Sequence, residues 1–350
     1  MQSSSGDYLS NLDHLRAFAV LQVFVWHFVH TSSSCPTPCF DRDFATIGPL
    51  VLFEEGHSGV ALFMCISGYV FAHLTHGKRI DTAIFWMNRA LRLLPLLVFW
   101  SVVTALLNPG NKPLDPMDMA RGIIAPGGWS IVIELQFYLL FPLLLIVSNR
   151  YGNRWLMGVV LLALIFRVAC WLEEGTVQNI AYWTLGGRID QFLVGYCAYG
   201  VTASRRAILA FGAIAVAVLV VAYSAFSYAG GFYAIGGYPS RDPLWIYWPL
   251  LEAVCYCAMI RAYILLEIPR RLDGALAHVG AWSYSIYLSH FYLVPILFAL
   301  LENNLGMPGH FTGRFLFAIA AFPVVVGVSA ATYNAIERPF LGFRRRYVHA

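Results

Sequence analysis

Charge is what this sequence lacks most. Of its 350 residues, 12% are charged and 59% are hydrophobic, and the mean hydropathy is +0.65. A soluble domain carries roughly 25% charged residues, so this shortage excludes a water-facing globular protein and indicates an integral membrane protein. The net charge is only +4, and we expect no nucleic-acid partner.

Several other signals are missing from the chain. It has no internal repeat, coiled-coil heptad or low-complexity linker, which predicts one domain over residues 1–350. The opening MQSSSGDYLSNLDH lacks the basic stretch of a cleavable signal peptide. No H-E-x-x-H motif or acidic cluster completes a metal site with His57 or His73, and no G-x-S-x-G elbow surrounds a serine. We therefore expect no metal and no permanently bound cofactor.

Long apolar runs are what the sequence has instead. A membrane-spanning helix needs about 20 mostly apolar residues, and ten segments meet or approach this length. The third is short and could begin earlier, near Thr82. The pattern predicts an all-α polytopic membrane protein with about ten transmembrane helices. The segments are 12–31, 57–76, 92–107, 129–148, 154–172, 187–204, 207–228, 243–266, 279–301 and 312–336.

Basic residues alternate between successive loops. They gather after the second, fourth, sixth and eighth segments and in the C-terminal tail, whereas the intervening loops mix basic with acidic residues. The positive-inside rule then places both termini in the cytoplasm. The loop 32–56 faces outward in this arrangement, and the sequence leaves open whether its Cys35 and Cys39 are bridged.

Ionisable side chains stand inside the first apolar segment, LDHLRAFAVLQVFVWHFVH. Arg16 and His27 are eleven residues apart, which places them within roughly 20° on one helix face and about 16 Å apart along the axis. Such residues face the bundle interior and are functional candidates. The structural alternative is that Arg16 is an interface anchor and His27 a helix-packing hydrogen-bonding group.

A carboxylate and two more arginines follow. Glu134, in GGWSIVIELQFYLLFP, is expected at a depth similar to that of His27, where it would orient the imidazole of a general base. Arg89 and Arg92, in RALRLLP, are neighbours on one helix face and suit a phosphate or pyrophosphate. The alternatives are a structural ion pair for Glu134 and topological anchors for the two arginines.

Seven motifs, in order, resemble the acyltransferase-3 family of membrane O-acyltransferases, which modify sugars and polysaccharides. Arg16 and His27 resemble the arginine and histidine of the family's first-helix signature, and RALRLLP resembles its paired arginines. The other matching segments are GHSGVALFMCISGYV, WSIVIELQFYLLFP, RIDQFLVG, YSIYLSH and ERPF. The chain departs from the family at His14, where a small residue is usual, and at Ala17, where glycine is common.

The resemblance implies an acyl-CoA donor, usually acetyl-CoA, that enters from the cytoplasm. It also implies a carbohydrate or glycolipid acceptor, and we expect a bacterial inner membrane as the location, with membrane lipids as partners. Outer-loop residues 32–56 are expected to contact the acceptor. The acceptor sugar, the acyl chain, the membrane face of transfer, the oligomeric state and a transient acyl-histidine intermediate stay open.

The expected chemistry is general-base catalysis by His27, supported by Glu134, on a sugar hydroxyl that attacks the thioester. Arginines at the cytoplasmic entrance would hold the phosphates of CoA. The expected site residues are the catalytic His27 and Glu134, the donor-binding Arg16, Arg89 and Arg92, and the substrate-binding Trp129, Tyr287 and His290.

Other functions explain parts of this pattern. A proton-coupled transporter or a flippase of a lipid-linked sugar would also use buried Arg, His and Glu, but the chain lacks matching Gly/Pro-broken helices in two halves. The larger MBOAT class of acyltransferases would use a histidine in the second half, as His290 is, and would leave the first-helix pattern unexplained. A structural scaffold would not need so many charges at depth.

Overall fold

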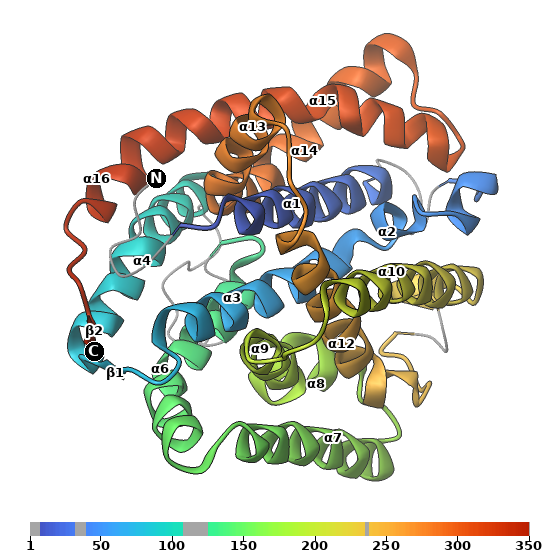
Figure 1. Cartoon of the computed structure of the whole chain (residues 1–350). Coiled ribbons are helices and arrows are strands. Elements are labelled where there is room, and N and C mark those ends of the chain that lie inside the picture. Colours follow the sequence, from blue (N-terminus) through green and yellow to red (C-terminus); the bar gives the residue numbers. More distant parts are fainter. Residues whose placement is uncertain (1–7, 32–39, 108–124, 235–237, 350) are drawn as a thin grey trace.

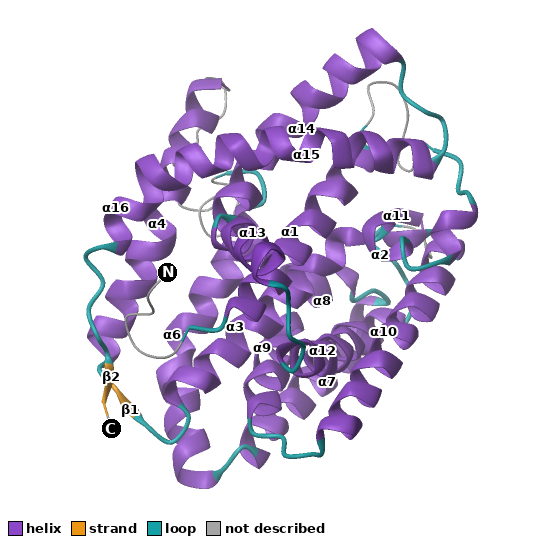
Figure 2. Ribbon diagram, turned by 45° about the horizontal axis from the view of Figure 1, so that its top comes forward, coloured by secondary structure: helices purple, strands orange, loops and turns teal. Residues whose placement is uncertain are grey.

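The structure is a computed structural model that describes residues 8–31, 40–107, 125–234 and 238–349. These residues are almost entirely helical (Figure 2). Two short strands, β1 (Arg79–Ile80) and β2 (Val348–His349), pair antiparallel near the C-terminus. The all-α prediction is confirmed in this coarse form.

Each of the ten apolar segments forms a helix. The long helices are α1 (Ser10–His30), α3 (Gly59–Thr75), α4 (Thr82–Leu107), α6 (Gly128–Tyr151), α7 (Arg154–Glu174), α9 (Leu185–Tyr199), α10 (Arg205–Tyr228), α12 (Leu244–Ile264), α14 (Ser283–Leu305) and α15 (Phe311–Thr332). Shorter pieces connect them. They are α2 (Val51–Glu54), α8 (Gln178–Trp183), α11 (Gly231–Ala234), α13 (Arg270–Ala281) and α16 (Arg338–Leu341), with the tight turns η1 (Phe44–Ile47) and η2 (Gly56–Ser58) and the π-helical turn η3 (Tyr333–Glu337).

Most boundaries lie within a few residues of the expectation, and three places show what decides them. The third helix begins at Thr82, the earlier of the two starts considered. The sixth ends at Tyr199 rather than at 204, because Ser204 caps the next helix by accepting a hydrogen bond from the Ala207 N–H. The ninth segment, expected to be continuous over 279–301, is interrupted at Trp282, where α13 ends and α14 begins.

Within the residues that the structure describes, seven helices are long and apolar enough to cross a membrane. They are α3 with its leading turn η2, α4, α6, α7, α10, α14, and α15 continued through α16. The expected count of ten is therefore not confirmed, and α1, α9 and α12 fall short. α9 has only 15 residues, and α1 carries buried polar residues such as Asp13 and Gln22.

Apolar side chains cover the outside of the bundle. The most apolar parts of α7, α10 and α15 have mean hydropathies of 2.2 to 2.5, yet only 22% of those residues are buried. Leu161, Leu162 and Phe211 are each more than half exposed. A soluble monomer does not expose apolar area on this scale, so the chain is an integral membrane protein.

The helices α1 and α3 lie in the middle of the bundle, between α15 on one side and α7 on the other (Figure 1). Glycines allow α3 to approach its neighbours closely. A Cβ atom on Gly59 would come within 2.4 Å of the Ala19 carbonyl of α1, and one on Gly68 within 1.9 Å of the Phe192 carbonyl of α9. The glycines of GHSGVALFMCISGYV therefore set the packing of the central helices.

Helix ends gather in two groups. In one group the start of α1 bonds to α13 through Ser10 and Asp273, and the end of α3 bonds to the end of α6 through Gly77 and Asn149. In the other group, the segment that follows α1 bonds to the segment before α15 through Asp41. The first group contains the first and last described residues. Which membrane face each group occupies, including the cytoplasmic placement of the termini, stays a prediction.

Candidate active site

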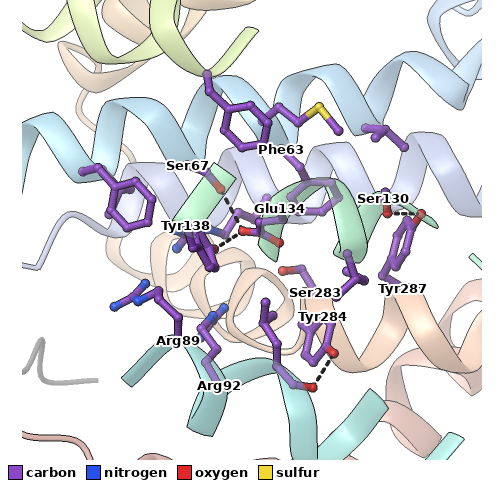
Figure 3. Close-up of a pocket in the computed structure, with 18 residues that line it drawn as sticks. Phe63, Ser67, Arg89, Arg92, Ser130, Glu134, Tyr138, Ser283, Tyr284 and Tyr287 are labelled. Carbon is purple, nitrogen blue, oxygen red and sulfur yellow. Dashed lines mark hydrogen bonds between the residues drawn. The ribbon is translucent and has the colours of Figure 1, made fainter. Parts of the chain in front are cut away.

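Two cavities lie along the central helices. The first, which we call the arginine cavity, encloses about 100 Å³ between α1, α3, α4, α6 and α14 (Figure 3). Its polar and charged lining residues are Arg16, Ser67, Arg89, Arg92, Ser130, Glu134, Tyr138, Ser283, Tyr284 and Tyr287.

The second, which we call the aromatic cavity, encloses about 190 Å³. It is built from α1, η2, α3, α6, α8, α11 and α14, together with Gly127 just before α6. Its aromatic and histidine lining residues are Trp26, His27, His57, Trp129, Tyr182, Trp183, Phe232, Tyr233, Tyr287 and Phe291. Eight of these ten residues are Phe, Tyr or Trp. Among the described residues, no arginine or carboxylate lines this cavity.

The two cavities are stacked along the same helices. α1 contributes Arg16 to the first and His27 to the second, and α6 contributes Glu134 to the first and Trp129 to the second. Tyr287 lines both and marks where they meet. The expectation that Arg16 and His27 share one face of their helix agrees with this placement.

Arg89 is held by aromatic rings. Its guanidinium carbon lies 5.4 Å from the ring centroid of Phe71 and 5.5 Å from that of Phe85, with Tyr138 and Tyr347 also within 6 Å. Among the described residues, its Nε has no hydrogen-bond partner and no carboxylate pairs with it. Its charge is therefore available to an anion.

The other two expected arginines have partners. Arg92 Nη1 lies 3.9 Å from the Oε1 atom of Glu337, the glutamate of ERPF. Arg16 pairs with Asp13, three residues earlier on α1. Figure 3 shows Arg89 and Arg92 side by side on one wall of the cavity. The structure thus brings the three arginines to one cavity, as the sequence predicted.

A fourth arginine, Arg344, was not identified as a site residue from sequence. Burial, together with the positive charges of Arg92 and Arg89, lowers the pKa of Arg344 to about 10. The pairing of β1 with β2 and the hydrogen bonds between Asn88 and the backbone of Arg345 hold the C-terminal tail beside α4. The tail arginines had been interpreted only as topological signals.

Glu134 does not contact His27. Its Oε1 atom accepts hydrogen bonds from the hydroxyls of Ser67, at 3.1 Å, and Tyr138 (Figure 3). The expectation that Glu134 lies at the depth of His27 is wrong, because Glu134 is five residues along α6 from Trp129 and lines the arginine cavity instead. Its catalytic role stays a prediction.

His27 is oriented by His290 instead. The Nδ1 atom of His27 lies 2.9 Å from the Val23 carbonyl and 3.2 Å from Nε2 of His290. The Nδ1 atom of His290 lies 3.2 Å from the Ile286 carbonyl. Since a carbonyl only accepts, we assign a proton to Nδ1 in both rings. The lone pair of His27 is then on Nε2, where a general base needs it.

Trp129 and Tyr287 lie where substrate-binding residues were expected, around the cavity that His27 lines. The ring centroid of Trp129 lies 4.5 Å from that of Trp183 and 5.0 Å from that of Tyr182. The Tyr287 hydroxyl lies 2.7 Å from the Ser130 Oγ. Arg188, from RIDQFLVG, is buried beneath this wall, with its guanidinium 4.2 Å from the Tyr182 ring centroid.

His57 and Glu55 were also missed. Both side chains are buried, and Nε2 of His57 lies 3.3 Å from Oε2 of Glu55. The signal that could have identified His57 is the one used for His27, an ionisable residue in an apolar run. No cluster of three metal-ligating side chains occurs in the described ranges. Cys35 and Cys39 lie outside them.

Comparisons with known proteins give the family of the chain. The model of a family described as an acyltransferase domain matches residues 9–334. A provisionally named O-acetyltransferase of Staphylococcus aureus (strain COL) is 25% identical over 95% of this chain and 57% of its own length. The O-acetyltransferase OatA of Staphylococcus aureus (strain NCTC 8325 / PS 47) is 25% identical over 82% of this chain and 51% of its own. The chain thus spans little more than half of these relatives, and no solved structure matches it significantly.

Proposed function

The chain belongs to the acyltransferase-3 family, and from this premise we propose that it transfers an acetyl group from acetyl-CoA to a hydroxyl of a carbohydrate or glycolipid. It is a membrane acyltransferase, and the relatives that it matches are named O-acetyltransferases. The donor, the acceptor and the catalytic base are the proposed parts, as is the bacterial inner membrane as its location.

The observation that carries the proposal is the stacking of the two cavities. Acetyl-CoA is anionic at its nucleotide end and neutral at its thioester end. The arginine cavity presents Arg16, Arg89 and Arg92 at one end of α1 and α4, with Arg344 beside them. His27 lies about 16 Å along α1 from Arg16, a distance comparable to the length of the pantetheine arm.

His27 and His290 supply the proposed chemistry. Nε2 of His27 takes the proton of the acceptor hydroxyl while that oxygen attacks the thioester carbonyl carbon. The tetrahedral intermediate collapses, the carbon–sulfur bond breaks, and the thiolate of CoA takes the proton back from the imidazolium. The products are the acetyl ester and CoA. His290 acts as a positioning residue that keeps the proton of His27 on Nδ1.

Glu134 serves the arginine cavity in this proposal. With Ser67 and Tyr138 it forms a partly buried polar group between the arginines and the point where the two cavities meet (Figure 3). It is therefore placed to hold the donor rather than to support His27. Trp129 and Tyr287 contact the acceptor at the start of the aromatic cavity.

The proposal is tested by donor binding, which needs no knowledge of the acceptor. The intact protein in detergent is melted against increasing acetyl-CoA, beside the Arg89→Ala/Arg92→Ala double variant. A ligand at about 100 times its dissociation constant adds roughly 2.7 kcal/mol of apparent stability. We expect a saturable rise in Tm for the wild type and loss of this rise in the double variant.

The matched control is Arg150→Ala/Arg154→Ala, which removes two exposed arginines at the α6–α7 connection. This control should respond to acetyl-CoA as the wild type does. If acetyl-CoA and longer acyl-CoAs leave the wild-type Tm unchanged, the donor proposal is wrong and the transporter alternative becomes the better explanation.

A further inference from the structure

The walls of the aromatic cavity are rings, yet polar nitrogens lie among them. Trp26, Trp129, Tyr182 and Trp183 supply broad ring faces, and His27 lies at the same cavity. A single water needs roughly 10–15 Å³ by this measure, so a space of about 190 Å³ accommodates a small molecule. Aromatic faces with a few placed polar groups are typical of a site for a neutral ligand.

His57 is the unusual residue of this cavity. Its side chain is 99% buried, and neither ring nitrogen has a hydrogen-bond partner among the described residues. The indole Nε1 of Trp26, whose side chain lines the same cavity, has none either. Nε2 of His57 lies 3.3 Å from a carboxylate oxygen of Glu55, so Nδ1 of His57 and Nε1 of Trp26 are the two nitrogens at this cavity left without any partner in the described part of the chain. A buried polar group without a partner costs about 1–3 kcal/mol, so these two nitrogens at one cavity indicate a polar ligand.

The side chain of Glu55 lies next to that of His57. Its Oε2 atom lies 3.3 Å from Nε2 of His57 and has no hydrogen-bond partner among the described residues. Gly231, with φ +68°, allows the chain to pass against this carboxyl, because a Cβ there would come within 2.3 Å of Glu55 Oε1. With Nε2 turned toward Glu55, Nδ1 is the nitrogen that remains for a ligand.

We propose that the aromatic cavity binds the acceptor as a single sugar ring, and that His57 hydrogen-bonds one of its hydroxyls. This inference rests on the proposed function and adds a site to it. A pyranose has flat C–H faces that pack on aromatic rings and hydroxyls around its edge that need hydrogen-bonding partners. An apolar acyl chain in this cavity would leave His57 and Trp26 unpaired.

The position of His27 connects this site to the reaction. His27 and Trp26 are consecutive on α1, and their rings lie 4.7 Å apart. The Trp26 ring in turn lies 5.9 Å from that of His57. A sugar held between Trp129 and Trp26, with one hydroxyl on His57, presents its other hydroxyls to His27. His57 is thus a residue that determines which sugar and which hydroxyl are accepted.

Saccharide binding tests the inference in the absence of donor. The intact protein in detergent is titrated with methyl glycosides of glucose, galactose, mannose and N-acetylglucosamine, and binding is followed by tryptophan fluorescence. Three tryptophans line the cavity, so a bound sugar ring should change the emission. His57→Phe keeps the aromatic ring and removes the hydrogen bond, and we expect its affinity to fall on the order of tenfold.

His57→Gln should recover part of this loss because its amide both donates and accepts. Trp183→Ala, which removes a partly exposed wall residue, should weaken binding of the same glycoside. The control is His76→Phe, the same change at an exposed position after the end of α3, and it should bind as the wild type does. The Tm rise with acetyl-CoA, measured on every variant, shows that each remains folded.

The outcomes separate this inference from the proposed function. If acetyl-CoA raises the Tm but no glycoside binds to the wild type, the acceptor site is wrong and the donor proposal stands. If His57→Phe binds glycoside as tightly as the wild type, the role of His57 is wrong. If glycoside binds and acetyl-CoA does not, the cavity is a sugar site and the acyl-transfer proposal fails.

Discussion

The arginine cavity and the aromatic cavity share four long helices, α1, α3, α6 and α14, and their chemistry is opposite. Three arginines line the first, while the second contains eight Phe, Tyr or Trp rings. The first suits an anion that must be held at one end of the bundle. The second suits a neutral molecule that must lose its water before it reacts. Tyr287, which lines both, marks where the two substrates would meet.

Burial acts on the charged groups at both ends of this arrangement. Near the arginine cavity it lowers the pKa of Arg344 to about 10, with help from Arg92 and Arg89. Near the aromatic cavity it raises the pKa of Glu55 to about 8 and that of Glu54 to about 7. Burial therefore makes the charged form more costly at each end, although Arg344 keeps its positive charge at neutral pH and suits an anionic ligand.

The largest effect is expected at His27, the proposed general base, which carries the proton from the acceptor hydroxyl to the thiolate of CoA. His27→Gln should lower kcat by about 10²–10⁴-fold, because the general base is lost. The Tm rise with acetyl-CoA should be unchanged, since the arginine cavity is intact. His30→Gln is the control, because His30 makes the same contact to the carbonyl four residues earlier but lines neither cavity. Full activity in His27→Gln would remove His27 from the mechanism.

A smaller effect is expected at His290, whose Nε2 lies 3.2 Å from Nδ1 of His27. His290→Leu should lower kcat by about tenfold, less than the roughly 10²–10⁴-fold expected for loss of the general base, while the KM for acetyl-CoA stays constant. His290→Gln, whose amide can still meet Nδ1 of His27, should recover part of the loss. Equal kcat values for the Leu and Gln variants would show that His290 is only a packing residue.

A change at Arg344 tests whether donor binding and glycoside binding occur at separate sites. Arg344→Ala should weaken acetyl-CoA binding by several-fold to about tenfold, the effect of one charge-assisted contact. It should leave glycoside binding unchanged, because Arg344 is far along the bundle from the aromatic cavity. Arg346→Ala, an exposed neighbour in the same tail, is the control. A loss of glycoside binding in Arg344→Ala would contradict the separation of the two sites.

The smallest effect is expected in the pH dependence of stability. The folded pKa of Glu55, about 8, exceeds its ordinary value of 4.5, so the folded protein binds more protons than the unfolded chain between these values. The free energy of unfolding should therefore fall as pH rises from 4.5 to 8, and Tm should fall by a few degrees. Glu55→Gln should flatten the profile, and the exposed Glu267→Gln should not. An unchanged slope in Glu55→Gln would mean that Glu55 does not titrate in this range.

The sequence alone predicted the helices and the three arginines that line one cavity. Apolar runs identify buried or lipid-facing helices by length, and the spacing of Arg16 and His27 places them on one face because helix geometry is regular. Arg89 and Arg92 could be paired for the same local reason. The sequence did not predict the helix break at Trp282, because residues 279–301 form one mostly apolar run.

What only the tertiary structure decided are the contacts between distant segments. Local spacing cannot tell that His290, 263 residues away, rather than Glu134, orients His27. Nor can it show that the tail brings Arg344 close to Arg89. It also cannot show that His57, with Glu55 beside it, joins the aromatic residues of α6, α8 and α11 at one cavity. Helix periodicity fixes which residues share a face, whereas the packing of helix against helix fixes which faces meet. In this protein the first determined the candidate residues, and the second determined their partners.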